Sequence, residues 1–577
     1  MNVDNILINL GEFGKYQKIR FYYLCISAGF LCSYAAFLQI FILATPGHRC
    51  AVSPQDEGEP TGVNASLQRN MLALAVPYEY SYGTYGPSKC RMYNHTDHID
   101  FTDPVAWNRS LVGSDDDDWN TTSCVYGYVY DHSDWEENVV TKFDLVCDRG
   151  WIVNTLFTIS NIGSISGLLL FSYIEDKYGR RPAFIVATVW YVATGLAYCL
   201  VQHWQVFAVL IFLKSFAGAA CFQIPWIIAI ELVGPKHHSL VLIVMCVAFA
   251  IACVVLAGLA YVCTTWIQLV LAVTVPVVGL AAVFPWLGES VRWLIATGRT
   301  KEAKKILAKI ATVNGTYFDE QNIDSLLQKE KTEREQHKHT TYGMWTVFSY
   351  SWNLAAKALI ITFVWGTNVI VYHGLTLNIE NLGGNQYLVF ALTSLVEIPA
   401  AVFCVGTDRV GRVTPMALSL MVAGLASIGC AAVPASATWA IILFATISKL
   451  CITISFDLIY LVSGVLFPTV IRASGMGFVS MASSIMNIPT PFIVYTARIQ
   501  PMLPMLVFGF LGLTAGCLAI FLPETMGEPL PDTLEAGEYY KVNMKSFWQN
   551  ATFAYGRGKR KPSLIDAPPP IRRTSVL

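Results

Sequence analysis

EDKYGRR, at Glu175–Arg181, returns in altered form as TDRVGR at Thr407–Arg412. Both copies contain an acid, a basic residue, a glycine and an arginine in the same order, and each follows a long apolar segment. The glycine suits a tight turn, and the acid and arginines can pair with neighbouring helix ends. Because the copies occupy equivalent places six apolar segments apart, they predict a chain built from two duplicated halves.

The composition indicates an integral membrane protein. The 577 residues are 54% hydrophobic and 14% charged, and the mean hydropathy is +0.47. Soluble domains carry about 25% charged residues, so a soluble enzyme or binding domain is excluded. The first apolar segment is too long for a cleavable signal peptide, and no small-residue cleavage site follows it closely.

Twelve apolar segments have roughly the ~20 residues that a helix needs to cross a bilayer. They are expected at 17–43, 151–174, 182–202, 204–232, 239–262, 266–287, 354–376, 386–406, 413–433, 437–463, 473–497 and 502–522. The expected fold is all-α, with twelve transmembrane helices in two six-helix halves, the major facilitator architecture. The amino-terminal half comprises 17–43 and 151–287, and the carboxy-terminal half comprises 354–522.

The insertion at 44–150 is expected to be a large glycosylated extracellular loop. It holds seventeen Asp or Glu against seven Lys or Arg. Its four Asn-x-Ser/Thr sequons and its four cysteines are typical of an oxidising, extracellular environment. The sequons are at Asn64, Asn94, Asn108 and Asn120, and the cysteines are Cys50, Cys90, Cys124 and Cys147. Four cysteines allow three pairings, among which the sequence does not choose.

Basic residues place the opposite side of the membrane in the cytosol. The central loop at 288–353 contains ten Lys or Arg, and both copies of the repeated turn are basic. This is the positive-inside pattern, so the segments 1–16 and 523–577 are both expected to be cytosolic. The polar, proline-bearing tail is expected to be largely disordered.

Further motifs resemble one family of solute carriers. They are TPGHRC at Thr45–Cys50, GESVRWLIATGRTKEAKKIL at Gly288–Leu307, YHGL at Tyr372–Leu375, GGNQYL at Gly383–Leu388, LVEIPA at Leu395–Ala400, LFPTVIR at Leu466–Arg472 and LPETMG at Leu522–Gly527. Together they resemble the organic cation, carnitine and organic anion transporter family, solute carrier family twenty-two. The resemblance implies a multi-pass plasma-membrane transporter of small organic ions that works by alternating access.

The resemblance also implies a cytosolic gate, with departures from the family pattern. Relatives pair a Glu at the end of span four with an Arg seven residues on, and repeat this between spans ten and eleven. Here the first half has Glu231 with His238, and the second has Val465 with Arg472. The gate residues expected are Asp176, Gly179, Arg180, Arg181, Glu231, Glu289, Arg292, Asp408, Arg409, Gly411, Arg412 and Arg472.

Four ionisable side chains stand out inside the predicted spans, where charge is costly and usually functional. They are Lys214 in span four, Glu397 in span eight, and Lys449 and Asp457 in span ten. Lys449, Thr453, Phe456, Asp457, Tyr460 and Gly464 share one side of span ten at about 100° per residue. Glu397 is the expected partner of Lys449, either as a structural salt bridge or as a pair that substrate perturbs. Lys214 either snorkels outward or lines the path.

Asp457 is the expected counter-charge for substrate. By resemblance, organic cation transporters carry a neutral glutamine at this place and an aspartate in span eleven, where this chain has Ser484. A carboxylate in the cavity without the arginine of the anion carriers favours a cationic or zwitterionic substrate. A helix-packing role and proton coupling remain alternatives.

Aromatic faces can complete a site for an ammonium group, which they bind within ~6 Å. The candidates are Trp226, Phe249, Trp365, Tyr372, Phe456 and Tyr460.

No enzyme, cofactor or metal motif is found, and no nucleic-acid partner is expected. There is no phosphate-binding Gly-x-x-x-x-Gly-Lys-Ser/Thr loop and no His/Cys cluster with metal spacing. Ser575-Val576-Leu577 matches the terminus that PDZ domains bind by strand addition. The leading hypothesis is a transporter of small organic cations or zwitterions, such as amine or carnitine-like compounds. An organic anion carrier and a non-transporting receptor or scaffold are the alternatives.

Overall fold

We describe a computed structural model of the chain. It describes residues 8, 10–11, 13–51, 75–81, 84–93, 121–234, 237–281, 287–317, 320, 325, 352–407, 411–434, 436–468 and 471–524. The four predicted sequons, Asp408, Arg409 and the carboxyl-terminal Ser575-Val576-Leu577 lie outside these residues.

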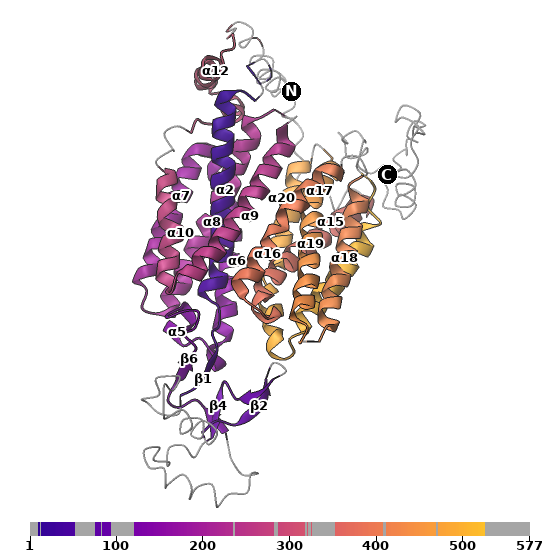
Figure 1. The fold of residues 1–577 in the computed structure, drawn as a ribbon. Helices are drawn as coiled ribbons and strands as arrows, with labels where there is room; N and C mark the ends of the chain where they lie inside the picture. Colours follow the sequence, from indigo (N-terminus) through magenta and orange to yellow (C-terminus); the bar gives the residue numbers. More distant parts are fainter. Residues whose placement is uncertain are drawn as a thin grey trace, which may run out of the picture.

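Two helical bundles lie side by side, each built from a continuous part of the chain (Figure 1). The first contains α2 (Lys15–Ile42), α6 (Trp151–Tyr178), α7 (Arg180–Ala197), α8 (Trp204–Leu232), α9 (His238–Val262) and α10 (Trp266–Ala281). The second contains α15 (Trp352–Leu377), α16 (Gln386–Leu395), α17 (Glu397–Gly406), α18 (Val413–Ala432), α19 (Thr438–Leu466), α20 (Arg472–Met486), α21 (Thr490–Tyr495) and α22 (Leu503–Ala519). The short 3-10 helices η3 (Tyr198–Leu200), η6 (Asn378–Leu382) and η8 (Thr496–Arg498) extend α7, α15 and α21.

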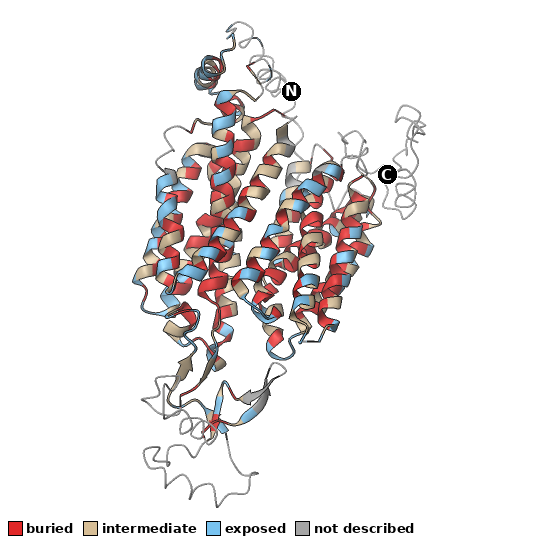
Figure 2. Cartoon of the chain, viewed as in Figure 1, coloured by how far each residue is buried: buried red, intermediate tan, exposed pale blue. Residues whose placement is uncertain are grey.

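The helices have the length and polarity of membrane spans. Ten helices among the described residues are long and apolar enough to cross a bilayer, and two shorter apolar helices, Trp266–Gly279 and Leu503–Ala519, lie where spans six and twelve are expected. Large apolar side chains such as Val209, Leu425 and Phe510 remain exposed on the outer faces, whereas the bundle interiors are buried (Figure 2). Apolar outer faces are what a lipid environment requires.

Proline divides two of the predicted spans. Pro399 has no N–H to bond with the Leu395 carbonyl four residues earlier, and α16 ends at Leu395. Glu397 therefore begins a new helix, α17, rather than sitting within a continuous one. Likewise Pro489 and Pro491 separate α20 from α21.

Glycines bring particular helices into close contact. A Cβ at Gly167 of α6 would collide with the Phe216 carbonyl of α8. In the second bundle a Cβ at Gly424 of α18 would lie 2.8 Å from the Gly509 carbonyl of α22. Small residues at such crossings allow the backbones to approach, as is usual between membrane helices.

The bundles meet along two helix pairs. α9 packs against α16 and α17, and α6 packs against α20 and α21. These contacts relate spans five and eight, and spans two and eleven, so the interface follows the duplication that the sequence predicts.

The segment after α2 forms a small disulfide-linked module at one end of the bundles, which we call the loop side (Figure 1). Antiparallel pairs join β1 (His48–Cys50) to β6 (Tyr128–Tyr130), β2 (Tyr78–Ser81) to β3 (Thr84–Pro87), and β4 (Arg91–Tyr93) to β5 (Thr121–Ser123). Of the three pairings open from sequence, the structure has Cys50–Cys124 and Cys90–Cys147. The helix α5 (Val139–Phe143) links the module to α6.

The opposite end carries the repeated turns and is called the repeat side here. α11 (Val291–Ala296) and α12 (Thr300–Asn314) cover the amino-terminal bundle there. The Asn314 side chain joins them to α2, because its oxygen accepts from the Tyr16 N–H at 3.0 Å and its nitrogen donates to Gln17 Oε1 at 2.9 Å.

Candidate functional site

Four of the six predicted aromatic residues form one cluster between α15 and α19. The ring centres of Trp365 and Tyr460 are 4.5 Å apart, and Phe456 lies 5.7 Å from Tyr460 and 5.7 Å from Tyr372. Phe456 and Tyr460, one turn apart on α19, therefore face two rings of α15. Those rings, Trp365 and Tyr372, are two turns apart. Such a row of rings can receive an ammonium group on its faces.

Tyr372 also connects the two charges that the sequence paired. Its hydroxyl donates to Glu397 Oε1 at 2.7 Å. Lys449 Nζ lies 3.1 Å from the centre of the Tyr372 ring and donates to the Tyr372 carbonyl at 3.0 Å. A third bond runs from Nζ to Thr376 Oγ1 at 2.6 Å.

Glu397 and Lys449 thus belong to one network but make no direct ion pair. Within the described residues no Glu397–Lys449 contact shorter than 4.0 Å is found, and Tyr372 lies between them. Both side chains are buried, at 6% and 4% exposure. Burying a charge costs several kcal/mol unless hydrogen bonds compensate, so the bonds through Tyr372 stabilise both ends.

Asp457 lies on the same side of α19, two turns beyond Lys449. Its Oδ2 accepts from the Cys404 thiol of α17 at 3.7 Å, which is a weak bond. In the described part of the chain it forms no ion pair. The site therefore contains one half-buried carboxylate beside the aromatic cluster that no cation neutralises.

Accessibility of the α19 stripe increases toward the repeat side. Lys449 and Thr453 are buried, Phe456 and Asp457 are half-buried, and Tyr460 is 47% exposed. The opposite side of the helix, with Ile452 and Ile459, is fully buried. The mixed polar and aromatic stripe predicted for span ten is therefore more accessible in its second half, from Phe456 to Gly464, than at Lys449 and Thr453.

The other two aromatic candidates lie in the amino-terminal bundle. Trp226 of α8 packs 6.0 Å from Phe222, and Phe249 of α9 lies 5.8 Å from Phe37, which reaches Phe390 of the second bundle at 5.6 Å. No ring contact joins either residue to the α15–α19 cluster in the described part of the chain. Phe249 is therefore at the bundle interface and Trp226 is within its own bundle.

Lys214 of α8 points into its own bundle, away from the charges of the second. Its Nζ lies 5.1 Å from the Tyr191 ring centre and 4.8 Å from the Tyr198 ring centre. Nζ has no hydrogen-bond partner among the described residues, and the side chain is 4% exposed. Of the two sequence interpretations, outward snorkelling does not fit a buried side chain held between two rings.

The predicted gate residues of the first half converge on the EDKYGRR turn. Arg180 pairs with Asp176 at 3.1 Å and with Glu231 at 3.6 Å. Glu289 Oε1 accepts from the backbone N–H groups of Arg180 and Arg181, at 3.0 and 3.3 Å. A carboxylate at a helix amino terminus satisfies free N–H groups and complements the helix dipole.

The second half repeats this arrangement with Glu524, a residue that the sequence analysis did not select. Glu524 Oε1 accepts from Arg412 N at 2.8 Å, and Oε2 accepts from Val413 N at 3.1 Å, at the start of α18. Gly179 and Gly411 have φ of 115° and 116°. A Cβ at Gly179 would collide with Glu289, and a Cβ at Gly411 would lie 2.9 Å from Glu524 Oε2. The signal was available, because GES follows span six and PET follows span twelve.

The remaining gate residues make backbone contacts. Arg292 Nε donates to the Glu231 carbonyl at 3.4 Å, and Arg472 Nε donates to the Phe467 carbonyl at 3.2 Å. Glu231, whose expected partner is replaced by His238, pairs instead with Arg180.

Among the described residues, one group of metal-ligand types lies close together, formed by His48, Cys90 and Cys147. The two cysteines are bonded to each other. A disulfide has no thiolate to offer, so this group is not a metal site.

Comparison with known proteins identifies the family. Residues 120–535 match the family described as "Sugar (and other) transporter". The organic cation transporter protein of Drosophila melanogaster is 32% identical over 94% of this chain and 95% of its own length. The beta-alanine transporter of the same organism is 32% identical over 99% of this chain and 94% of its own. Solute carrier family 22 member 1 of Bos taurus is 32% identical over 93% of both.

A solved structure supports the fold. The partially occluded inward open conformation of the xylose transporter XylE from E. coli has a TM-score of 0.54 and 14% identity, covering 89% of this chain and 99% of that one. The family and these relatives are membrane transporters rather than enzymes. The chain therefore belongs to the sugar (and other) transporter family of the major facilitator fold, with organic cation transporters and solute carrier family 22 members among its relatives.

Proposed function

We propose that the chain transports small organic cations or zwitterions across the plasma membrane by alternating access between its two bundles. Asp457 supplies the negative charge of the central site. The rings of Trp365, Tyr372, Phe456 and Tyr460 supply faces for an ammonium group and exclude water around it.

The observation that carries this proposal is the un-neutralised carboxylate beside the aromatic cluster. The two basic side chains that the sequence analysis singled out are engaged differently: Lys449 donates to Tyr372 and Thr376, and Lys214 lies between two rings of the other bundle. A substrate cation next to Asp457 therefore meets an attractive charge that no protein cation already offsets.

The names of relatives support the same class. Among them are an organic cation transporter protein, a beta-alanine transporter and a carcinine transporter, all of Drosophila melanogaster. Carcinine carries an amine, and beta-alanine is a zwitterion. A site with one carboxylate and several rings suits both, and we propose this class without choosing one compound.

For orientation, we propose that the loop side is extracellular and the repeat side cytosolic. The disulfide-linked module with its sequon-rich sequence supports the first assignment, and the basic turns support the second. In that orientation the more accessible part of the α19 stripe lies nearer the cytosolic side.

The test is labelled uptake into cells that express wild type, Asp457→Asn or Asp457→Glu. Tetraethylammonium serves as a permanent cation, carcinine as an amine and benzoate as an anion. Asp457→Asn should raise KM for tetraethylammonium about tenfold or more, equivalent to ~1.4 kcal/mol, whereas Asp457→Glu retains part of the affinity. Unchanged KM in Asp457→Asn would refute the role of Asp457.

The same experiment addresses the alternatives. An organic anion carrier would take up benzoate and would lose that uptake in Lys449→Met. A proton-coupled role for Asp457 would make uptake of the permanent cation depend on a pH gradient in wild type and not in Asp457→Asn. A receptor or scaffold would bind tetraethylammonium without accumulating it.

A further inference from the structure

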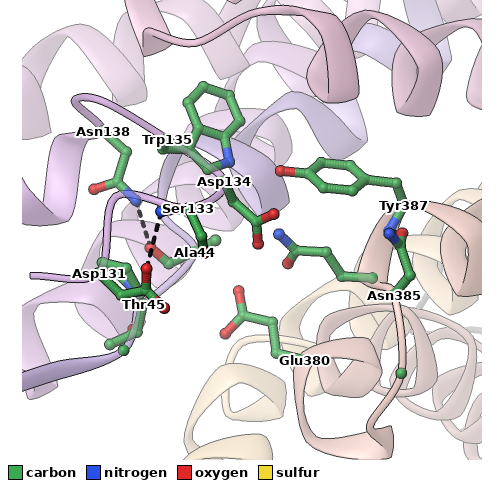
Figure 3. Close-up of a pocket in the computed structure, with 14 residues that line it drawn as sticks. Ala44, Thr45, Asp131, Ser133, Asp134, Trp135, Asn138, Glu380, Asn385 and Tyr387 are labelled. Atoms are coloured by element: carbon green, nitrogen blue, oxygen red, sulfur yellow. Dashed lines mark hydrogen bonds between the residues drawn. The ribbon is translucent and has the colours of Figure 1, made fainter. Parts of the chain in front are cut away.

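A cavity of about 220 Å³ lies on the loop side (Figure 3). Its lining includes neither Asp457 nor any ring of the α15–α19 cluster. Residues 44–47 and 131–138 of the amino-terminal half line one part of it, and residues 380–387 of the carboxy-terminal half line the other. Drug-sized ligands occupy roughly 300–1,000 Å³, so this cavity suits a smaller molecule.

Ordered contacts build the wall from the amino-terminal half. Asn138 caps α5 and donates to the Ala44 carbonyl at 2.9 Å, which fixes the segment against the end of α2. The Asp131 N–H donates to the Gly47 carbonyl at 2.7 Å. The opposite wall is held by Tyr387, whose ring lies 5.8 Å from Phe41 and 5.7 Å from Tyr261.

Three carboxylates, Asp131, Asp134 and Glu380, line the cavity, and its described lining contains no lysine or arginine. Arg498, outside the lining, acts electrostatically on Glu380 and offsets one charge in part. Asp131 and Asp134 therefore give the cavity a net negative charge, which attracts cations.

Trp135 adds a second requirement. It is only 3% exposed, and its Nε1–H makes no well-aligned hydrogen bond within the described residues, although the Tyr387 hydroxyl lies close enough to interact with it. In Figure 3 the indole nitrogen is on the side of the ring that faces Asp134 and Tyr387. A buried N–H without a well-aligned partner is costly, and a ligand oxygen placed here would satisfy it.

We propose that this cavity is a second, outer binding site for a small primary ammonium compound that also carries a hydrogen-bond acceptor. The carboxylates bind the ammonium group, and the Trp135 N–H donates to the acceptor. The ligand class rests on the proposed function, but the residues are separate from those of the central site. Because both halves line the cavity, an occupant also favours the arrangement in which the loop-side ends are together.

Equilibrium binding to the purified full chain tests the proposal with three isosteric probes. Ethanolamine has both the ammonium group and the hydroxyl acceptor. Propylamine (n-propylamine) has only the ammonium group, and ethylene glycol has hydroxyl acceptors but no charge. Titration calorimetry on the Asp457→Asn chain reduces the contribution of the central site to the measured binding. Ethanolamine should bind more tightly than n-propylamine, and ethylene glycol should not bind. Equal binding of ethylene glycol and ethanolamine would overturn the proposal.

Two variants separate the contributions of the lining. Asp134→Asn with Glu380→Gln should weaken ethanolamine about tenfold, whereas Glu136→Gln with Asp148→Asn, exposed acids outside the lining, should not. Trp135→Phe should reduce ethanolamine to the affinity of n-propylamine and leave n-propylamine unchanged. Unchanged ethanolamine affinity in the lining variant, or displacement of ethanolamine by lower concentrations of CaCl₂, would overturn the assignment.

The two proposals fail separately. Loss of outer binding in every chain, with Asp457-dependent uptake intact, refutes only the outer site. Outer binding retained in a chain whose uptake does not depend on Asp457 refutes only the central one.

Discussion

Lys449 and Tyr372 make two contacts at once: the ammonium lies 3.1 Å from the ring centre and donates to the carbonyl of the same residue at 3.0 Å. The Tyr372 hydroxyl, at the far end of that ring, donates to Glu397 at 2.7 Å. One tyrosine therefore separates two opposite charges. Its hydroxyl is hydrogen-bonded to Glu397, and its ring face and carbonyl contact the Lys449 ammonium group.

Tyr372→Phe should separate the two roles of this residue. The variant keeps the ring under Lys449 but removes the donor to Glu397, leaving a buried carboxylate with one bond fewer. We expect a loss of about 1–3 kcal/mol in unfolding free energy. The checks are the thermal unfolding midpoint and surface expression, with Tyr460→Phe as the control, since Tyr460 is exposed. Equal losses in both variants would contradict this interpretation.

Glu397 and Lys449 should be energetically coupled although they do not touch. Glu397→Gln or Lys449→Met alone leaves one buried charge without its counter-charge, which costs about 3–5 kcal/mol when a buried pair is broken. The double variant removes both charges, so its unfolding free energy should fall by less than the sum of the single losses. A strictly additive cycle would show that Tyr372 insulates the two charges from each other.

Glu289 and Glu524 should have equivalent effects in the two halves. Glu289→Gln and Glu524→Gln each replace a charged acceptor at a helix start by a neutral one, with an expected cost of about 0.5–2 kcal/mol. The two sites are in different bundles, so the losses should add within ~0.5 kcal/mol. Thermal unfolding of the single and double variants measures this. A loss in only one half would mean that the duplicated turns have diverged in role.

Gly167→Ala and Gly258→Ala form a matched pair in α6 and α9. A Cβ at Gly167 collides with the Phe216 carbonyl, whereas a Cβ at Gly258 meets nothing within 4 Å. Gly167→Ala should therefore reduce the amount of folded protein. Gly258→Ala should be neutral or should stabilise by up to about 1 kcal/mol, because alanine is the better helix former. Monodisperse protein recovered in detergent is the measure for both, and equal recovery would argue against the close crossing.

Much of the fold could be predicted because it depends on local patterns. The repeated Asp-Lys/Arg-x-Gly-Arg turn and the apolar segment lengths predicted two duplicated helical halves, and the family comparison confirms the resemblance seen in the motifs. The pairing of Cys50 with Cys124 and of Cys90 with Cys147 could not be predicted. It depends on how a folded module brings distant cysteines together, which spacing alone does not determine.

The candidate site was predictable in part, for a related reason. Helical periodicity placed Lys449, Phe456, Asp457 and Tyr460 on one side of α19, and that grouping requires only one helix. Which residue of another helix lies opposite requires three-dimensional packing. Sequence reasoning therefore paired Glu397 with Lys449 directly and missed that Tyr372 comes between them. It also missed Cys404 as the neighbour of Asp457.

Glu289 and Glu524 each reach from the end of a six-helix unit back to the start of its third helix, at Arg180 and Arg412. Each unit thereby fastens its own last segment, without help from the other. We therefore expect the covalent link between the units to be dispensable for assembly. Two separate polypeptides, 1–325 and 326–577, produced in one cell should associate into a working transporter, and each would serve as a partner for variants of the other.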